Sequence, residues 1–305
     1  MPAHVGTRKV AHFVTCDARL LCDCDHVVEI ADHKVYMSAK QYNGQSLSMF
    51  FLRTLFIAAL LMTGSHATAD ARKVMSFDPA NARSVSNIFS PSTFTNRQLT
   101  LNQNAMDVVR DPAMGHNVVR FSAAPRSGGT VSKSSVLHQG FTAPEGSTLV
   151  VELDVFVEGS SAKGLFLADI ECRSCWPERS LISNKSPGIR LFVQNNGRLG
   201  LDRGKLGMRG SSLLGRGPAF PTNQWAKIRW RMQVSSSDQA YTEILVNGVP
   251  HLQTRGATLM NDRIFRRNGI RLQRFLYDYV EFGITANESG GNRALRLGDV
   301  KISLE

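Results

Sequence analysis

The sequence predicts an all-β protein, a two-sheet antiparallel jelly-roll sandwich, and three observations support that class. About ten short segments alternate apolar and polar residues, and turn residues separate them at hairpin spacing. No segment has the period of a long amphipathic helix, and there is neither an internal repeat nor an interdomain linker. A closed barrel is the main alternative, because its strands would alternate in the same way.

The clearest alternation lies between Trp225 and Val249. Its apolar side consists of Ala226, Ile228, Trp230, Met232 and Val234, and its cationic and aromatic side consists of Trp225, Lys227, Arg229, Arg231 and Gln233. A second alternating run, Tyr241 to Val246, ends at Asn247-Gly248, a dipeptide typical of a hairpin turn. We expect the cationic side to line a concave surface, although a solvated convex face would give the same pattern.

The remaining strands follow in chain order from their alternation. They are Met75–Phe77 at an edge, Val118–Ser122, Ser134–Phe141, Thr148–Val157, Gly164–Glu171, Gly188–Gln194 with its hairpin partner Arg198–Asp202, Arg271–Asn287 and Leu295–Leu304. Residues Gly204 to Thr222 are rich in Gly, Arg and Ser and predict a long loop, whereas Thr258 to Arg267 could form one helical turn.

The N-terminal region predicts export. Residues 49–69 contain an apolar run after Arg53 and a small-x-small motif at Ala67-Thr68-Ala69, the layout of a signal peptide, with a buried helix as the alternative. The run is too short to span a membrane comfortably. Residues 1–48 precede it, so we expect them to be a disordered upstream extension. The mature protein is then a single domain, residues 70–305, secreted or periplasmic and without a stable membrane span.

Charge and cysteine content narrow the partners. Six of the 36 Lys and Arg residues and five of the 25 Asp and Glu residues precede residue 70, which leaves 30 basic against 20 acidic residues. An exported basic protein is suited to anionic partners, although a solvated basic surface is the simpler explanation. Cys172 and Cys175 are the two cysteines of the mature chain, and in an oxidising compartment we expect them to form a local disulfide.

Several motifs resemble those of a known superfamily. The strings PGIRLFV, NGRLGLD, WAKIRW, YTEILVNG, YVEFGIT and LRLGDVKI occur in this order between Phe121 and Glu305. Together they resemble the concanavalin A-like lectin and glucanase superfamily, and most of all its secreted jelly-roll polysaccharide lyases. The resemblance implies the fold, whereas lectins, laminin-G-like modules and glycosidases of the superfamily differ in activity.

Two activities within that superfamily are not supported. Retaining glucanases need a second glutamate after Glu152-Leu153-Asp154, and the sequence lacks one at the required spacing. Alginate lyases of this fold resemble one another in an R-x-E-x-R motif, but this chain has Arg229-Trp230-Arg231 without the central glutamate.

Cleavage of a uronate polymer by β-elimination would need a group that neutralises the carboxylate, a base and an acid. The predicted carboxylate-binding residues are Arg190, Gln194, Arg229, Arg231, Gln233 and Gln139, and the predicted base and acid residues are His138, Tyr277, Tyr279 and Tyr241. For each one, ordinary packing or solvation is an alternative. We also expect the cationic side of the Trp225 strand to share its hollow with Tyr277 and Tyr279.

The leading hypothesis is therefore an exported monomer that binds an acidic polysaccharide, and not nucleic acid, with β-elimination as the cleavage reaction that these residues would allow. A non-catalytic lectin-like module and a laminin-G-like module with a protein partner are the alternatives. No cofactor is expected, except that the resemblance allows a structural Ca²⁺ with Asp78 and Asp299 as oxygen ligands.

Overall fold

The computed structural model describes residues 26–30, 33–37, 71–175, 186–207, 212–267 and 269–305. The chain divides into two compact units, Met1–Ala67 and Thr68–Glu305. In the first unit, β1 (His26–Ile30) and β2 (His33–Met37) form an antiparallel hairpin. The predicted signal peptide lies outside the described residues, and the proposed upstream extension lies mostly outside them. None of the described helices has the length and apolar character of a membrane-spanning segment.

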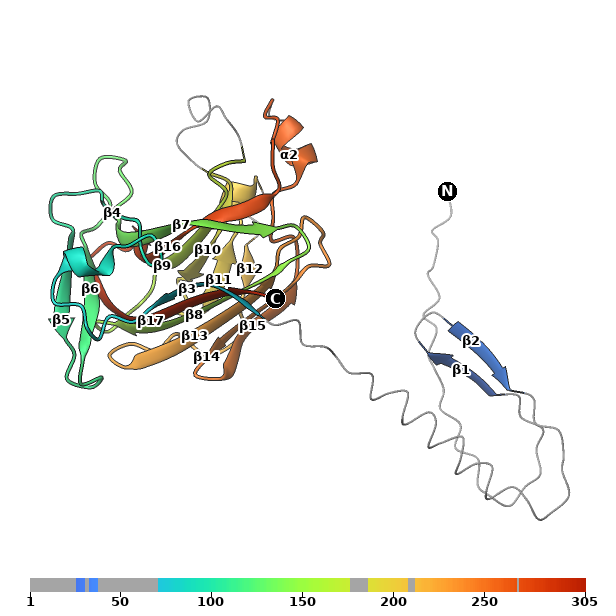
Figure 1. The fold of residues 1–305 in the computed structure, drawn as a ribbon, viewed down its shortest axis with the longest axis horizontal. Coiled ribbons are helices and arrows are strands. Elements are labelled where there is room, and N and C mark those ends of the chain that lie inside the picture. Colours follow the sequence, from blue (N-terminus) through green and yellow to red (C-terminus); the bar gives the residue numbers. More distant parts are fainter. Residues whose placement is uncertain (1–25, 31–32, 38–70, 176–185, 208–211, 268) are drawn as a thin grey trace, which may run out of the picture. The chain divides into compact units, whose positions relative to one another are not determined.

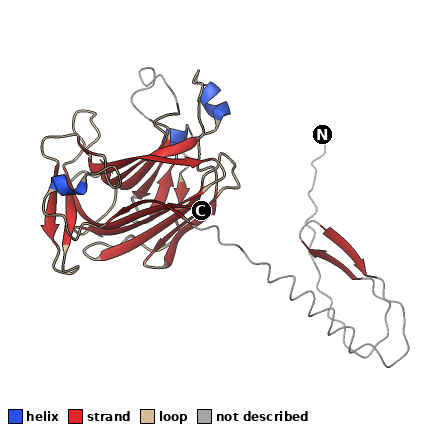
Figure 2. Ribbon diagram, in the orientation of Figure 1, coloured by secondary structure: helices blue, strands red, loops and turns tan. Residues whose placement is uncertain are grey.

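The second unit is a sandwich of two antiparallel sheets, with strands far outnumbering helices (Figure 2). The seven-stranded sheet contains, in spatial order, β12 (Leu213–Leu214), β11 (Leu199–Asp202), β10 (Gly188–Val193), β9 (Leu165–Glu171), β16 (Leu276–Asn287), β7 (Ser134–Pro144) and β4 (Asn96–Leu99). Its two central strands, β9 and β16, both carry charged residues, which makes it the sheet of interest for the site.

The eight-stranded sheet packs against it (Figure 1). It contains, in spatial order, β15 (Val249–Arg255), β14 (Tyr241–Val246), β13 (Trp225–Gln233), β8 (Thr148–Val157), β17 (Arg293–Leu304), β6 (Asn117–Ala123) and β5 (Ala105–Arg110), and β3 (Arg72–Phe77) also pairs with β17. The helical elements are short: η1 (Val85–Ile88), η2 (Gly204–Leu206) and α2 (Asp262–Arg267). The predicted sandwich and the predicted helical turn near Arg267 are confirmed.

Alternation places the core as predicted. Ile228, Trp230 and Met232 of β13 are buried between the sheets, while Lys227 and Arg229 point away from them. On β16, Val280, Phe282 and Ile284 fill the opposite side of the same core. Burial of such side chains contributes about 1.5–3 kcal/mol each, so the core faces of these two strands fix which of their residues can reach solvent.

Four strands of the sandwich were missing from the prediction, namely β4, β5, β12 and β15, and they are the end strands of the two sheets. In β4, the sequence Asn96–Leu99 has no buried residue, and in β5 only Met106 is buried. An edge strand needs no apolar alternation when only its backbone pairs with the sheet. Such strands are therefore invisible to a periodicity argument.

Candidate functional site

The face of the seven-stranded sheet that points away from the core carries a buried set of polar side chains, here called the buried polar face. Its members are Asp169 and Glu171 of β9, Arg190 of β10, Tyr279 and Glu281 of β16, and Lys205 of η2. The strand register places Tyr279 opposite Glu171 and Glu281 opposite Asp169. Antiparallel partners lie about 4.5–5.5 Å apart at their Cβ atoms, so the register alone brings these groups together.

Three carboxylates meet at the centre of this face. Asp169, Glu171 and Glu281 each offer an oxygen, and these oxygens lie within 4.8 Å of one another. The Lys205 Nζ donates to Asp169 Oδ2 at 2.8 Å and also bonds Glu171 Oε1. Thr285 donates to the other Asp169 oxygen at 2.8 Å. The cluster is thus a closed network in which one ammonium holds two acidic groups.

The environments of two of these carboxylates shift their pKa values in opposite directions. Burial raises the pKa of the Glu281 carboxyl, and Lys133 at 2.8 Å opposes that shift only in part. Burial would also raise the pKa of Asp169, but Lys205 and other nearby cations outweigh it and lower that pKa to about 2. Although burial opposes it, the charges of Asp169 and Glu171 raise the pKa of the Lys205 ammonium. Lys205 and Asp169 are therefore both charged at neutral pH.

Arg190 forms the more open part of the buried polar face, with 22% of its side chain exposed. Its Nε donates to Asp202 Oδ2 at 2.8 Å, and its guanidinium lies 4.2 Å from the centre of the Phe166 ring. Phe166 in turn stacks on Phe192 at 5.3 Å between ring centres. A planar guanidinium held by a carboxylate and an aromatic ring is oriented to bind a further carboxylate.

Tyr279 lies beside the carboxylates with its hydroxyl directed toward the edge strand β4. Gln98 Nε2 donates to the Tyr279 hydroxyl at 3.2 Å, and the Arg173 guanidinium lies 3.9 Å from the ring centre. Burial, followed by the charge of Glu281, raises the pKa of the phenol. Tyr279 is therefore a neutral phenol, which suits a proton donor better than a base.

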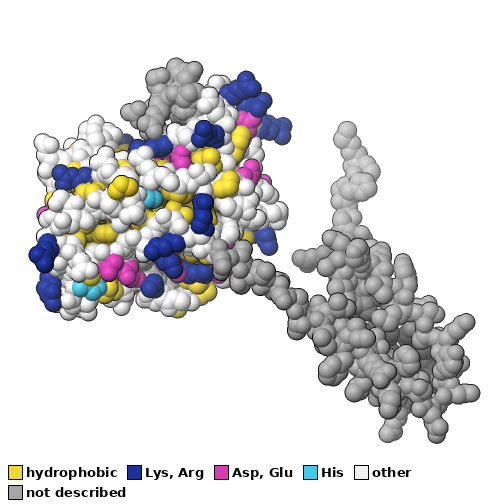
Figure 3. Space-filling view, viewed as in Figure 1, with side chains coloured by type: hydrophobic (Ala, Val, Ile, Leu, Met, Phe, Trp, Pro, Cys, Tyr) yellow, Lys and Arg dark blue, Asp and Glu magenta, His cyan; other side chains and the backbone are white. Residues whose placement is uncertain are grey.

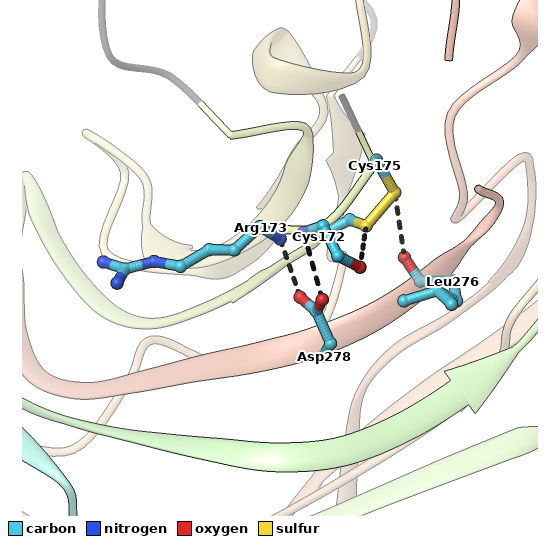
Figure 4. The surroundings of a disulfide bond; sticks show 6 residues. Cys172, Arg173, Cys175, Leu276 and Asp278 are labelled. Carbon is cyan, nitrogen blue, oxygen red and sulfur yellow. Dashed lines mark hydrogen bonds between the residues drawn. A yellow bond between two sulfur atoms is a disulfide. The ribbon is translucent and has the colours of Figure 1, made fainter. Parts of the chain in front are cut away.

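The disulfide loop supports the position of Arg173. Cys172 and Cys175 form the predicted disulfide, and Asp278 of β16 accepts from the backbone N–H groups of Arg173 at 2.7 Å and Ser174 at 3.1 Å (Figure 4). Because Asp278 precedes Tyr279 directly, one strand fixes both the tyrosine and the loop that covers it.

The eight-stranded sheet has a different outward surface, here called the exposed polar face. Its members are Glu152, Lys227, Arg229, Arg231 and Glu305. Arg231 Nη2 lies 3.0 Å from Glu305 Oε2, and Arg229 Nε lies 3.5 Å from Glu152 Oε1. Both arginine side chains are 38% exposed, so these pairs are ordinary solvated surface pairs.

The expected hollow shared by Arg229 and Tyr279 does not form, because β13 and β16 belong to different sheets. Arg231, Gln233 and Tyr241 also lie in the eight-stranded sheet, and the Tyr241 hydroxyl bonds Glu243 at 3.3 Å. These residues are therefore separated by the hydrophobic core from the polar cluster of the other sheet.

Two predicted catalytic residues belong to the core side. Tyr277 is fully buried in the hydrophobic core, and its hydroxyl donates to the Thr258 carbonyl. It faces the core, unlike Tyr279, because the pairing of β16 with β7 shifts register between these two residues. His138 is paired with Val280, bonds the Thr93 carbonyl and stacks on Phe141. Burial lowers the pKa of His138, as expected for a neutral, packed imidazole.

The structure brings together three of the predicted residues. Arg190 and Tyr279 lie on the buried polar face, and Gln139 is the ladder partner of Tyr279. Gln194 lies at the turn after β10 and donates to the Leu199 carbonyl at 2.6 Å. Asp169, Glu171 and Lys205 were missed, although two acidic residues within the otherwise apolar run from Gly164 to Glu171 are a signal that the sequence contains.

A metal ion does not suit the carboxylate cluster, because it would compete with cations already paired there: Lys205 with Asp169 and Glu171, and Lys133 with Glu281. The predicted calcium ligands lie elsewhere. The β3–β17 ladder pairs Phe77 with Val300, so Asp78 and Asp299 occupy the next pair of positions. Calcium at these two residues stays a prediction.

No protein-family model and no curated protein matches the chain. Among solved structures, it is similar to an endo-β-1,4-glucuronan lyase from the fungus Trichoderma reesei, at 12% identity over 76% of this chain and 95% of that one, with a TM-score of 0.53. The fold is concanavalin A-like.

Two further structures are similar at lower scores. The cellulose induced protein Cip1 is 14% identical over 75% of this chain and 96% of that one, with a TM-score of 0.48. The alginate lyase Aly36B is 12% identical over 76% of this chain and 96% of that one, with a TM-score of 0.44. The sequence-based resemblance to the concanavalin A-like superfamily is confirmed at the level of fold.

Proposed function

We propose that this protein binds an acidic, uronate-containing polysaccharide on the buried polar face and cleaves it by β-elimination. The observation that supports the proposal most directly is the register of β9, β10 and β16. It brings the Arg190 guanidinium, the Glu171 carboxylate and the neutral Tyr279 phenol to one side of a sheet, and the Lys205 ammonium of η2 bonds Glu171 there. These are the groups that an elimination next to a carboxylate requires.

Arg190 and Lys205 are the groups proposed to neutralise the uronate carboxylate. Both are held by acidic residues of the chain, Arg190 by Asp202 and Lys205 by Asp169 and Glu171. The two cations are therefore already oriented before a substrate binds, and little reorganisation is needed as negative charge develops on the sugar.

Glu171 and Tyr279 are the proposed base and acid, since they are direct ladder partners. Glu171 takes the proton from C5 of the uronate, and the electron pair of that C–H bond forms the C4–C5 double bond. The C4–O bond breaks, and the leaving oxygen takes the proton of the Tyr279 phenol. The reaction consumes no water, oxidant or reductant, and it leaves one unsaturated uronate end.

The fold and the disulfide support this proposal from outside the site. The glucuronan lyase of T. reesei has the same fold, and its name states that it cleaves a uronate polymer. The Cys172–Cys175 disulfide is compatible with an oxidising compartment, as proposed for a secreted or periplasmic protein. Monomeric state and the absence of nucleic-acid binding stay predictions.

A non-catalytic lectin-like module is the second candidate. The observation that favours it is burial, because only 1% of Tyr279 and 6% of Glu171 is exposed. A face that binds sugar through Arg190 alone would need neither residue to reach the substrate. A laminin-G-like module with a protein partner is the third hypothesis from the sequence.

Product formation separates these candidates. The protein is incubated with polyglucuronate, polymannuronate and a neutral glucan, and the ultraviolet absorbance of the unsaturated product is followed. We expect product from a uronate polymer and none from the glucan. Saturable, salt-sensitive binding to a uronate polymer without product would establish the lectin-like candidate, and no binding to any glycan would leave the laminin-G-like one.

A further inference from the structure

Five arginines lie close together in the sequence between β15 and β16. This arginine cluster consists of Arg263, Arg266, Arg267, Arg271 and Arg274. All five are exposed. Asp262 is the only acidic residue between positions 261 and 275, so five positive charges and one negative charge leave this segment a net charge of +4.

The arginine cluster is poorly neutralised. Within the described part of the chain, Arg266 is the member with an ion pair, to Asp262 one helical turn earlier. Arg263, Arg266 and Arg267 project from the short helix α2 at spacings of three and four residues, which places neighbouring side chains on one side. Like charges this close repel, and an exposed group of them attracts anions.

Arg266 and Arg271 also line one hollow. Together with Gly269 and Ile270 they surround an open depression of about 420 Å³. Its lining residues include two arginines and the apolar Ile270, a combination suited to an anionic group on a carbon ring. In the space-filling view, Lys and Arg side chains gather at the end of the domain where α2 lies (Figure 3).

The arginine cluster adjoins the buried polar face on two sides. Gly207 directly follows η2 and lies close to Ile264 of α2: a Cβ atom added to this glycine would come within 2.6 Å of the Ile264 side chain. Helix α2 therefore packs directly against the end of η2. The backbone N–H of Gln273 donates to the Cys175 carbonyl at 2.7 Å, which joins the cluster to the disulfide loop. The cluster is therefore at the rim of the same sheet face that holds Lys205 and Tyr279.

We propose that the arginine cluster is a second binding surface for an anionic polysaccharide, outside the buried polar face and continuous with it. A long chain anchored at the buried polar face would extend over α2 and bind there through its carboxylates, whereas a short oligosaccharide would not reach. Affinity then rises with chain length and falls with salt. The inference rests on the proposed acidic substrate and not on its cleavage.

A polysaccharide is favoured over nucleic acid or an anionic membrane because of this continuity. A duplex or a vesicle would need a broad cationic surface of its own. The arginine cluster is small, with a net charge of +4, and its nearest neighbours are η2 and the disulfide loop of the proposed site.

The test compares two triple charge reversals. The first variant carries Arg267→Glu, Arg271→Glu and Arg274→Glu. The control carries Arg72→Glu, Arg83→Glu and Arg110→Glu, exposed residues of β3, the loop after it and β5. Both change the net charge equally. Dissociation constants are measured at several salt concentrations for long polyglucuronate, its trisaccharide, duplex DNA and vesicles containing anionic lipid.

We expect the first variant to lose about tenfold or more in affinity for long polyglucuronate, because it loses three contacts at once although each exposed contact is weak. Its affinity should also depend less steeply on salt, since fewer charges take part in binding. Its affinity for the trisaccharide should stay within about twofold of wild type, and the control should match wild type. A variant that binds the long polymer as wild type does would overturn the inference. A loss confined to DNA or vesicles, or a wild type that does not bind polyglucuronate, would also overturn it.

Cleavage is measured separately on the same samples. If neither wild type nor variant forms unsaturated product while the difference in long-chain affinity persists, the proposed elimination fails and the arginine surface stands. If product forms and the affinities of wild type and variant do not differ, the proposed elimination stands and the arginine surface is overturned.

Discussion

The two outward faces of the sandwich contain the same kinds of residue and yet differ in character. Each pairs basic with acidic side chains across neighbouring strands. On the exposed polar face, Arg229 and Arg231 are 38% exposed beside Glu152 and Glu305. On the buried polar face, only 1% of Asp169 and of Glu281 is exposed. The difference arises from the elements that lie over each sheet and not from the strands themselves.

The covering elements are η2 and the disulfide loop. Lys205 of η2 bonds two carboxylates of β9, and Arg173 of the disulfide loop lies over Tyr279 of β16. In the described residues, the exposed polar face has no comparable cover over Arg229. Coulombic interactions are much stronger where water is excluded, so similar ion pairs should differ in their effect on stability and chemistry.

The largest expected difference concerns Lys205. Lys205→Met removes the ammonium that bonds the buried carboxylates of Asp169 and Glu171, and we expect a loss of about 3–5 kcal/mol in the free energy of unfolding. The matched variant on the exposed polar face, Arg229→Met, should cost less than about 1 kcal/mol. Urea unfolding of both variants measures the two values. Equal small losses would show that the burial of the Lys205 network has no energetic consequence.

The next prediction concerns the two tyrosines. Tyr279→Phe removes the proposed proton donor, and we expect turnover of a uronate polymer to fall about 100-fold with little change in affinity. Tyr241→Phe removes a hydroxyl from the eight-stranded sheet and should leave turnover unchanged. Initial rates of product formation and the dissociation constants are measured for both. A Tyr279→Phe variant with wild-type turnover would remove Tyr279 from the mechanism.

A smaller effect is expected in acid. The pKa of Asp169 is lowered from an ordinary 3.8 to about 2, so its contribution is present above about pH 4 and is lost as the pH falls through about 2. That contribution is about 2 kcal/mol. The raised pKa of Glu281 has the opposite effect on stability: the buried carboxyl lowers the free energy of unfolding as the pH rises above its ordinary pKa of 4.5.

Unfolding free energies between pH 5 and pH 2 test this prediction. The wild type should lose stability across the lower half of the range, and Asp169→Asn, less stable throughout, should lose less there. Glu305→Gln serves as the control on the exposed polar face and should follow the wild-type curve. If Asp169→Asn is as acid-sensitive as wild type, the network of Lys205 does not hold an ionised Asp169.

The smallest effect is expected for Arg229 and Arg231, which the sequence predicted to bind the substrate carboxylate. Arg229→Ala combined with Arg231→Ala should change stability by less than about 1 kcal/mol and glycan affinity by less than about twofold. Titration with long polyglucuronate measures the affinity. A tenfold loss would restore the sequence-based hypothesis that this face binds the substrate.

Alternation predicted which residues lie in the core but not which sheet they belong to. The pattern of β13 identified Ile228 and Trp230 as inward, and both are buried. Nothing in that pattern indicates that β8 is its other neighbour, or that β16 lies in the opposite sheet. Sheet membership depends on non-local pairing, which a local period of two does not encode.

The candidate site was predicted only in part for related reasons. Arg190, Gln139 and Tyr279 were identified because they alternate outward on recognisable strands. Lys205 was missed because it follows a strand in a Gly-rich loop, and its role depends on η2 lying over β9. Tyr277 was misassigned because a register shift between β7 and β16 interrupts the alternation.

The position of β17 has a consequence for biogenesis. This strand, Arg293–Leu304, comes last among the described strands and yet lies between β8 and β6, with β3 also paired to it. The middle of the eight-stranded sheet therefore stays open until these residues have been synthesised. Non-local pairing of this kind makes folding slow, so the sandwich should close late, only after its last strand has been synthesised.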